Sequence, residues 1–180
     1  MEYGACVSSR YTEDKMEDTI KKIDGLGIKY KRYEHKAVLT CLESTALLPK
    51  DMEGVRTKNI FLRDRKKENY ILVVVEENKR IDYKELSNFM NLKSLKMADQ
   101  QDLMKYLHVE IGALSMLSLF NDKDKKVKLV IDKDIWSEEA FDCQPDKLGV
   151  VLLIWKEDWL KIFNNLNIKP DIIKIPEKDI

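Results

Sequence analysis

Two short, uninterrupted apolar runs constrain the fold of this chain more than any other feature. Residues 71–75 read ILVVV and residues 150–155 read VVLLIW. Neither run approaches the roughly 18 apolar residues that a membrane span needs. Apolar runs of this length are typical of strands, and the second run is long enough for a buried strand. The sequence therefore predicts a globular chain built around a sheet.

Helices and further strands follow one another irregularly along the rest of the chain. Apolar residues spaced by three and four predict a helix over residues 12–26 and a last helix whose apolar face holds Trp159, Leu160, Phe163 and Leu166. Shorter helices are expected over residues 42–48, after Asp82 and after Asp99. Strands are expected near residues 28–33, 59–62, 70–75, 127–131 and 149–155, and a hairpin joins the second and third. This order predicts an α+β fold, a mixed sheet surrounded by helices, in one domain over residues 1–180 with a loose tail at 170–180.

Composition narrows the classes of function. The 180 residues carry 32 Lys+Arg and 32 Asp+Glu, so the formal net charge is zero. This balance excludes a globally basic protein that holds nucleic acid by bulk attraction, but it allows a local basic patch. Cys6, Cys41 and Cys143 lie far apart without a CxxC pair, which argues against a disulfide framework and a structural zinc site. We expect a cytoplasmic protein with no signal peptide and no membrane contact.

Common catalytic motifs are absent from the sequence. It contains no GxSxG, GxxxxGK[ST], GxGxxG or HExxH, and His35 and His108 are interpreted as surface or packing residues. Three local features remain. Lys58 begins an apolar strand and can direct its ammonium into a cleft, although a solvated lysine at a strand edge explains it as well. The small residues from Gly112 to Leu119 allow backbone amides to approach a ligand, and Phe141 to Asp146 is interpreted as a turn.

In their order and separation, these features resemble the YbaK/ProX family, whose editing domain is related to the insertion domain of bacterial prolyl-tRNA synthetases. Thr57 to Asp64 matches the family's Thr-Lys-Asn-[Leu/Ile]-Phe-Leu-[Arg/Lys]-Asp strand. An upstream His-x-[Ala/Pro]-Val-x-Thr segment is matched by His35, Ala37, Val38 and Thr40. Gly112 to Asp122 corresponds to the family's glycine loop and the Asn-Asp that follows it. The similarity spans roughly residues 15 to 165.

The resemblance implies a free-standing deacylase that hydrolyses mischarged aminoacyl-tRNA, most often Ala-tRNA(Pro). It implies a site without a side-chain nucleophile, metal or cofactor, in which a water activated by a ribose hydroxyl attacks the ester. The catalytic residues carried over are Lys58, Gly112, Ser115 and Gln144. The substrate-binding residues carried over are Val38, Thr40, Leu42, Thr57, Asn59, Met116 and Pro145. The implied partners are mischarged, proline-specific tRNA and prolyl-tRNA synthetase.

Two positions depart from the family pattern. Met116 stands where the family usually has proline, and Gln144 stands where many relatives have histidine before Pro145. Glutamine can hydrogen-bond to a bound water but cannot take up a proton. These changes are compatible with a different mischarged amino acid, a slower enzyme or a loss of hydrolysis. The alternative function is a non-catalytic protein of the same fold that binds tRNA or its aminoacylated end and regulates another protein.

Basic residues gather around the predicted hairpin, where they are candidates for contact with tRNA phosphates. The candidates are Arg56, Arg63, Arg65, Lys66 and Lys67, with Lys58 beside them. Because Asp64 and Glu68 lie among them, an ordinary charged turn is the competing interpretation.

Overall fold

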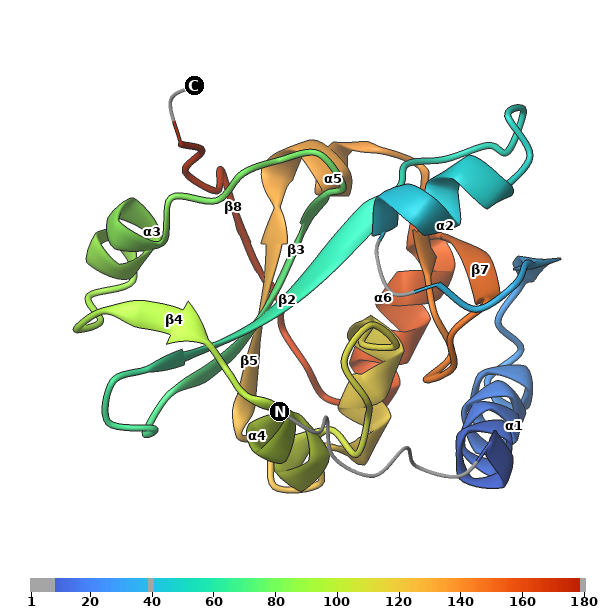
Figure 1. Ribbon diagram of the computed structural model, residues 1–180, viewed down its shortest axis with the longest axis horizontal. Helices are drawn as coiled ribbons and strands as arrows, with labels where there is room; N and C mark the ends of the chain where they lie inside the picture. Colours follow the sequence, from blue (N-terminus) through green and yellow to red (C-terminus); the bar gives the residue numbers. More distant parts are fainter. Residues whose placement is uncertain (1–8, 39–40, 179–180) are drawn as a thin grey trace.

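The computed structural model describes residues 9–38 and 41–178 and contains two sheets (Figure 1). The larger sheet has the order β4-β2-β3-β5-β8, with β4 at Leu95–Met97, β2 at Thr57–Asp64, β3 at Tyr70–Glu76, β5 at Val127–Asp132 and β8 at Asp171–Ile173. The smaller sheet has the order β1-β7-β6, with β1 at Tyr30–Glu34, β7 at Val150–Trp155 and β6 at Ala140–Cys143. The larger sheet is mixed, because β4, β2 and β3 pair antiparallel whereas β3, β5 and β8 pair parallel. The predicted α+β class is confirmed, and the second sheet is a feature that the sequence did not indicate.

The helices lie around these sheets (Figure 1). They are α1 (Ser9–Gly25), α2 (Cys41–Leu47), α3 (Tyr83–Phe89), α4 (Gln100–Tyr106), the 3-10 helix η1 (Met116–Asn121), α5 (Lys133–Ser137) and α6 (Lys156–Asn165). Asp82 caps α3 and Asp99 caps α4, as predicted, because each carboxylate accepts backbone N–H groups of the first turn. None of the helices in the described ranges is long and apolar enough to cross a membrane.

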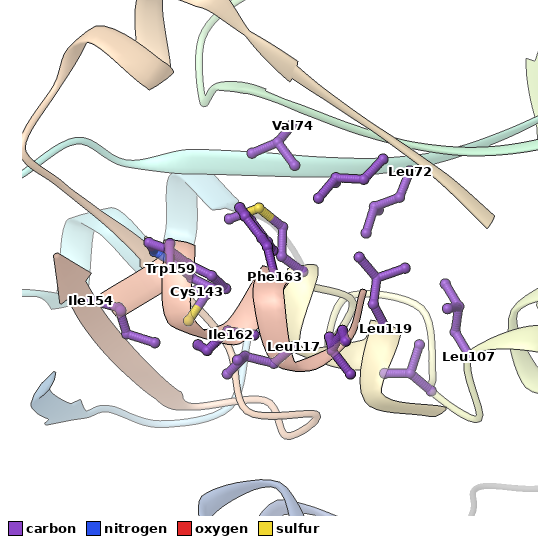
Figure 2. Packing of buried hydrophobic residues seen from close by; sticks show 14 of the residues in the cluster. Leu72, Val74, Leu107, Leu117, Leu119, Cys143, Ile154, Trp159, Ile162 and Phe163 are labelled. Carbon is purple, nitrogen blue, oxygen red and sulfur yellow. The ribbon is translucent and has the colours of Figure 1, made fainter. Parts of the chain in front are cut away.

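The apolar run of β3 is buried on both faces of the larger sheet. Leu72 and Val74 face the main core, where Figure 2 shows them opposite the side chains of α6 and η1. Ile71, Val73 and Val75 face a second core with α3. Each such side chain contributes about 1.5–3 kcal/mol when fully buried, so β3 anchors the strand beside it, β2.

Aromatic stacking fixes α6 against β6. The ring centroids of Phe141 and Trp159 lie 5.7 Å apart, and Trp159 stacks on Phe163 at the same distance. The prediction that Leu160 belongs to the buried face is wrong, since its side chain is 45% exposed. Ile162 takes that place because it lies three residues after Trp159 on the same face of the helix.

The C-terminal segment corrects another expectation. Residues 170–180 were expected to form a loose tail, but β8 pairs in parallel with β5, and Glu177 bridges to Ile81. The alternating isoleucines provide the physical reason, because Ile175 is buried in the second core and Ile173 packs against it. These contacts lie in the described part of the segment, which ends at residue 178.

The two sheets meet where the chain enters β2. Val55 bridges to Phe141 in parallel, with its N–H donating to the carbonyl oxygen of Ala140 at 3.0 Å. The N–H of Asp142 donates to the carbonyl oxygen of Val55 at 3.1 Å. Gly54 permits this approach, because it has φ +76° and an added Cβ would lie 2.7 Å from the Ala140 oxygen.

Gly54→Ala is therefore expected to lower the free energy of unfolding by about 2 kcal/mol, through backbone strain and this clash. Gly25→Ala is the matched control, since nothing lies within 4 Å of a Cβ there, and its effect should stay within about 1 kcal/mol. Urea denaturation of both variants measures the difference. Equal stabilities of the two variants would show that the junction does not depend on Gly54.

Candidate functional site

A pocket with a volume of about 420 Å³ opens at the junction of the two sheets. The first half of β2 forms one wall, β6 forms another, and α2, the 111–114 loop and the end of β4 complete it. Much of the lining is apolar, from Val38, Ile60, Phe61, Ala98, Leu103 and Leu114. The polar side chains in the wall come mainly from β2, β6 and the turn after β3.

Lys58 is held in place by backbone carbonyl groups. It pairs with Val75 in the β2–β3 register, so its side chain reaches the turn that follows β3. Its Nζ donates to the carbonyl oxygens of Glu77 at 2.8 Å and Lys79 at 2.9 Å. Both acceptors are uncharged, so they orient the ammonium without neutralising it. An ammonium has three N–H donors, and one remains for a ligand in the pocket.

Asp142 is a buried carboxylate in the pocket wall that the sequence prediction missed. The backbone N–H of Thr57 donates to its Oδ1 at 2.6 Å, and the Thr57 hydroxyl donates to its carbonyl oxygen at 2.9 Å. Burial raises the pKa of Asp142 to about 6. The hydrogen bonds from Thr57 and the positive charge of Arg56 act in the opposite direction and lower this pKa. Glu77 also raises this pKa, since its carboxylate repels a second negative charge.

The interpretation of Phe141 to Asp146 as a turn explains why Asp142 was missed. Phe141 to Cys143 form β6 instead, and all three residues are buried. The sequence signal for this buried carboxylate is an acidic residue, Asp142, that stands between the apolar Phe141 and Cys143 and ahead of a buried strand. Burial and the neighbouring Asp142 raise the pKa of the Cys143 thiol, so this cysteine packs as a neutral group.

Side chains of α2 form the mouth of the pocket. Thr45 donates its hydroxyl to the Glu77 carboxylate at 2.5 Å. Ser44 Oγ lies 2.8 Å from His35 Nε2, and His35 Nδ1 lies 2.7 Å from the carbonyl oxygen of Lys36. Because that carbonyl can only accept, Nδ1 carries the proton and Nε2 accepts from Ser44. His35 thus anchors α2 to the end of β1, which agrees with its interpretation as a packing residue.

The glycine loop reaches the pocket at Gly112, which has φ +90°. The side chain of Gln100 holds this loop, because its Oε1 accepts the N–H of Ile111 at 2.9 Å. Ser115 follows but is fully buried and caps η1, so its expected catalytic role is not supported by its position. Its hydroxyl donates to the backbone oxygen of Gln144 at 2.5 Å and so ties the loop to β6.

The structure brings together most of the residues predicted for the site. Those that line the pocket are Val38, Thr57, Lys58, Asn59, Gly112 and Gln144. The predictions that Met116 and Pro145 form its wall are wrong, because both are buried outside it, Met116 in the main core. Thr40 lies outside the described residues, as does the side chain of Leu42, whose backbone belongs to α2.

Asp102 of α4 and Asp99, the N-cap of this helix, engage part of the predicted basic cluster. The Nε of Arg63 lies 3.1 Å from Asp102, and the Arg63 side chain is 10% exposed. Lys67 pairs with Asp102 at 3.1 Å and with Asp99 at 3.3 Å. Arg63 is therefore committed to a buried contact within the protein, and its assignment to tRNA binding needs correction. Lys67 is 43% exposed, and its assignment stays a prediction.

The remaining basic residues lie at opposite ends of β2. Arg65 and Lys66 are exposed at the tip of the hairpin, whereas Arg56 precedes β2 at the pocket end and is half-buried. Arg65 lies eight positions after Thr57, which corresponds to about 26 Å at about 3.3 Å per residue. The predicted cluster is thus two separate basic positions.

Comparison with known proteins places the chain among editing proteins. The family described as "Aminoacyl-tRNA editing domain" matches residues 35–162. "Prolyl-tRNA editing protein ProX" of Acetoanaerobium sticklandii is 32% identical over 151 residues, which cover 83% of this chain and 90% of that protein. "Prolyl-tRNA synthetase associated domain-containing protein 1" of Danio rerio is 28% identical over 174 residues, 94% of this chain and 91% of that protein. The fold matches the solved structure of a proposed trans-editing enzyme for prolyl-tRNA synthetase with a TM-score of 0.66 at 10% identity, covering 96% of this chain and 100% of that one.

The buried Asp142 predicts a pH-dependent stability. The pKa of Asp142 is about 6 in the folded protein and 3.8 ordinarily. Between these two pH values the folded state binds more protons than the unfolded state, so the free energy of unfolding falls as pH rises through this range. Relative to Asp142→Asn, the wild type should gain about 2 kcal/mol between about pH 7.5 and about pH 4.5. Urea denaturation of both proteins at the two pH values measures this, and a constant difference would show that Asp142 titrates normally.

Proposed function

The chain belongs to the aminoacyl-tRNA editing domain family, and we propose that it acts in trans on proline-specific tRNA carrying alanine. Hydrolytic editing of aminoacyl-tRNA is the activity of this family. The choice of alanine and of proline-specific tRNA rests on the resemblance of Thr57 to Asp64 to the YbaK/ProX strand and on the similarity to a prolyl-tRNA editing protein. Prolyl-tRNA synthetase belongs to this proposal as a partner, because an editor acting in trans must meet tRNA that this enzyme has released.

A physical limit on synthetase selectivity creates the need for such an editor. An apolar pocket built for a larger amino acid rejects a smaller one by only about 1–3 kcal/mol. A second site that admits the smaller side chain and excludes the larger one restores accuracy. The apolar lining of the present pocket suits a small aliphatic side chain such as that of alanine.

The fixed ammonium of Lys58 carries the mechanistic proposal. Water attacks the ester carbonyl carbon, a negatively charged tetrahedral intermediate forms, and its collapse breaks the bond to the ribose oxygen, which leaves with a proton. In this proposal the remaining N–H of Lys58 and the backbone N–H of Gly112, which lines the same pocket, stabilise the developing oxyanion. Because Gln144 cannot take up a proton, the neighbouring ribose hydroxyl of the substrate accepts the proton of the attacking water and passes its own proton to the leaving ribose oxygen.

Two exposed apolar side chains at the pocket rim suit the terminal nucleoside of the tRNA. Met97 is 63% exposed and Ile111 is 60% exposed, and both line the pocket. In our proposal the terminal base packs against them, because exposed apolar side chains that line a pocket commonly mark a binding surface.

Lys58→Ala should lower the single-turnover rate of Ala-tRNA(Pro) deacylation by about 10²–10³-fold, the usual effect of removing one oxyanion donor. Lys21→Ala is the matched control, because Lys21 is exposed on α1, away from the pocket. Release of labelled alanine measures the rate. If the wild type leaves alanyl, seryl and cysteinyl esters intact at high enzyme concentration, the hydrolase proposal fails and the non-catalytic binding alternative stands.

Arg65 and Lys66 at the hairpin tip are proposed to contact phosphates of the tRNA body. Their joint reversal to glutamate should weaken tRNA binding and reduce the slope of log affinity against log salt by about 2, one for each lost contact. Filter binding at several salt concentrations measures both quantities. Reversal of Arg10 and Lys21 on α1 is the charge-matched control, and equal effects of the two double variants would contradict a specific role for the hairpin.

A further inference from the structure

Three oxygen acceptors belong to pocket-lining residues of β2, of β6 and of the position after β6. One is the carboxylate of Asp142, which is buried in the wall. The others are Asn59 Oδ1 and Gln144 Oε1, two buried oxygens that have no hydrogen-bond partner among the described residues. Leaving such an oxygen buried and unsatisfied is unfavourable. A ligand that supplies N–H donors at this wall would remove that cost.

The β2 register separates this acceptor group from Lys58. Successive strand residues point to opposite faces, so Asn59 shares a face with Thr57, the residue that hydrogen-bonds to Asp142. The Nδ2 of Asn59 lies 3.5 Å from the hydroxyl oxygen of Thr57. The Oδ1 of Asn59, on the other side of the amide group, therefore points away from that hydroxyl. Lys58 extends the other way, to the carbonyls after β3. The pocket therefore has a cationic side and an acceptor side.

Two charged side chains act on Asp142. Glu77 lines the same pocket and acts on Asp142 as a second negative charge. Arg56 opposes it, but its Nη1 is buried with no hydrogen-bond partner in the described part of the chain. The Asp142 carboxylate is thus oriented by the backbone N–H of Thr57 and can accept a further hydrogen bond from a ligand.

We propose that Asp142, Asn59 and Gln144 bind the α-ammonium group of the esterified amino acid, so that the enzyme acts on tRNA whose amino acid has a free amino group. An ammonium offers three donors and no acceptor, which matches a site of three acceptors. Acylation of the nitrogen removes its charge and two of those donors. Peptidyl-tRNA and N-acylated aminoacyl-tRNA are therefore spared. This inference rests on the proposed function and adds the class of substrate.

Two substrates that differ only at the nitrogen test the proposal, Ala-tRNA(Pro) and N-acetyl-Ala-tRNA(Pro). The wild type should hydrolyse the first at least about 10²-fold faster, which corresponds to about 2.7 kcal/mol. Asp142→Asn should slow hydrolysis of Ala-tRNA(Pro) and raise its KM about 10-fold or more, while N-acetyl-Ala-tRNA(Pro) is unaffected. The preference for the free amine should therefore shrink in this variant.

Asp146→Asn is the matched control for a buried carboxylate. Asp146 is buried near β6 but accepts hydrogen bonds from the Thr19 and Ser118 hydroxyls and does not line the pocket. Its variant should keep the wild-type preference whatever its stability. An equal loss of preference in Asp146→Asn would overturn the assignment to Asp142.

The outcomes separate this inference from the proposed function. If the wild type hydrolyses both substrates at similar rates, the inference is wrong and the deacylase proposal stands. If it hydrolyses neither, the deacylase proposal is wrong, and calorimetric binding of 3′-alanylamino-3′-deoxyadenosine and its N-acetyl form decides the inference directly. Tighter binding of the free amine by the wild type supports it, and equal binding overturns it.

Discussion

The hydrogen bonds between Thr57 and Asp142 are the contact on which the pocket depends. Eighty-five positions separate the two residues in the sequence, and they join the start of β2 to β6 through one backbone and one side-chain donor. The same contact brings the Lys58 strand beside Gln144 and orients a carboxylate whose burial is unfavourable. Gly54 allows the approach, and the buried β3 run holds β2 in register. The site thus exists because two sheets are joined edge to edge.

The electrostatics of the pocket follow from how each charged group is held. Lys58 is oriented by two neutral carbonyl oxygens, which do not neutralise its charge. Arg63 and Lys67 instead form ion pairs with the carboxylate of Asp102 on α4. A cation held in this way can act on an ester or a phosphate. The zero net charge of the chain is consistent with an enzyme that contacts the end of a tRNA and releases it, since tight sequence-independent binding needs an excess of positive charge.

Local sequence patterns predicted the local structure well. The hairpin, the Asp82 and Asp99 caps and the position of Lys58 depend on residues within a few positions of one another, and all were found. Features set by distant partners were missed. Ser115 caps η1 and donates a hydrogen bond to the backbone oxygen of Gln144, and Asp142 lies in β6. Residues 171–173 form a strand because they pair with β5. Single-sequence periodicity holds no information on such pairings.

In our proposal this pocket removes alanine from proline-specific tRNA by hydrolysis. Single-turnover assays of the purified wild type on alanyl- and prolyl-tRNA(Pro), side by side with enzyme-free reactions, test it most directly. We expect the wild type to release alanine well above the spontaneous rate and to leave hydrolysis of the prolyl ester at its spontaneous rate. Release of both amino acids at the spontaneous rate, or equal acceleration of both, would contradict it.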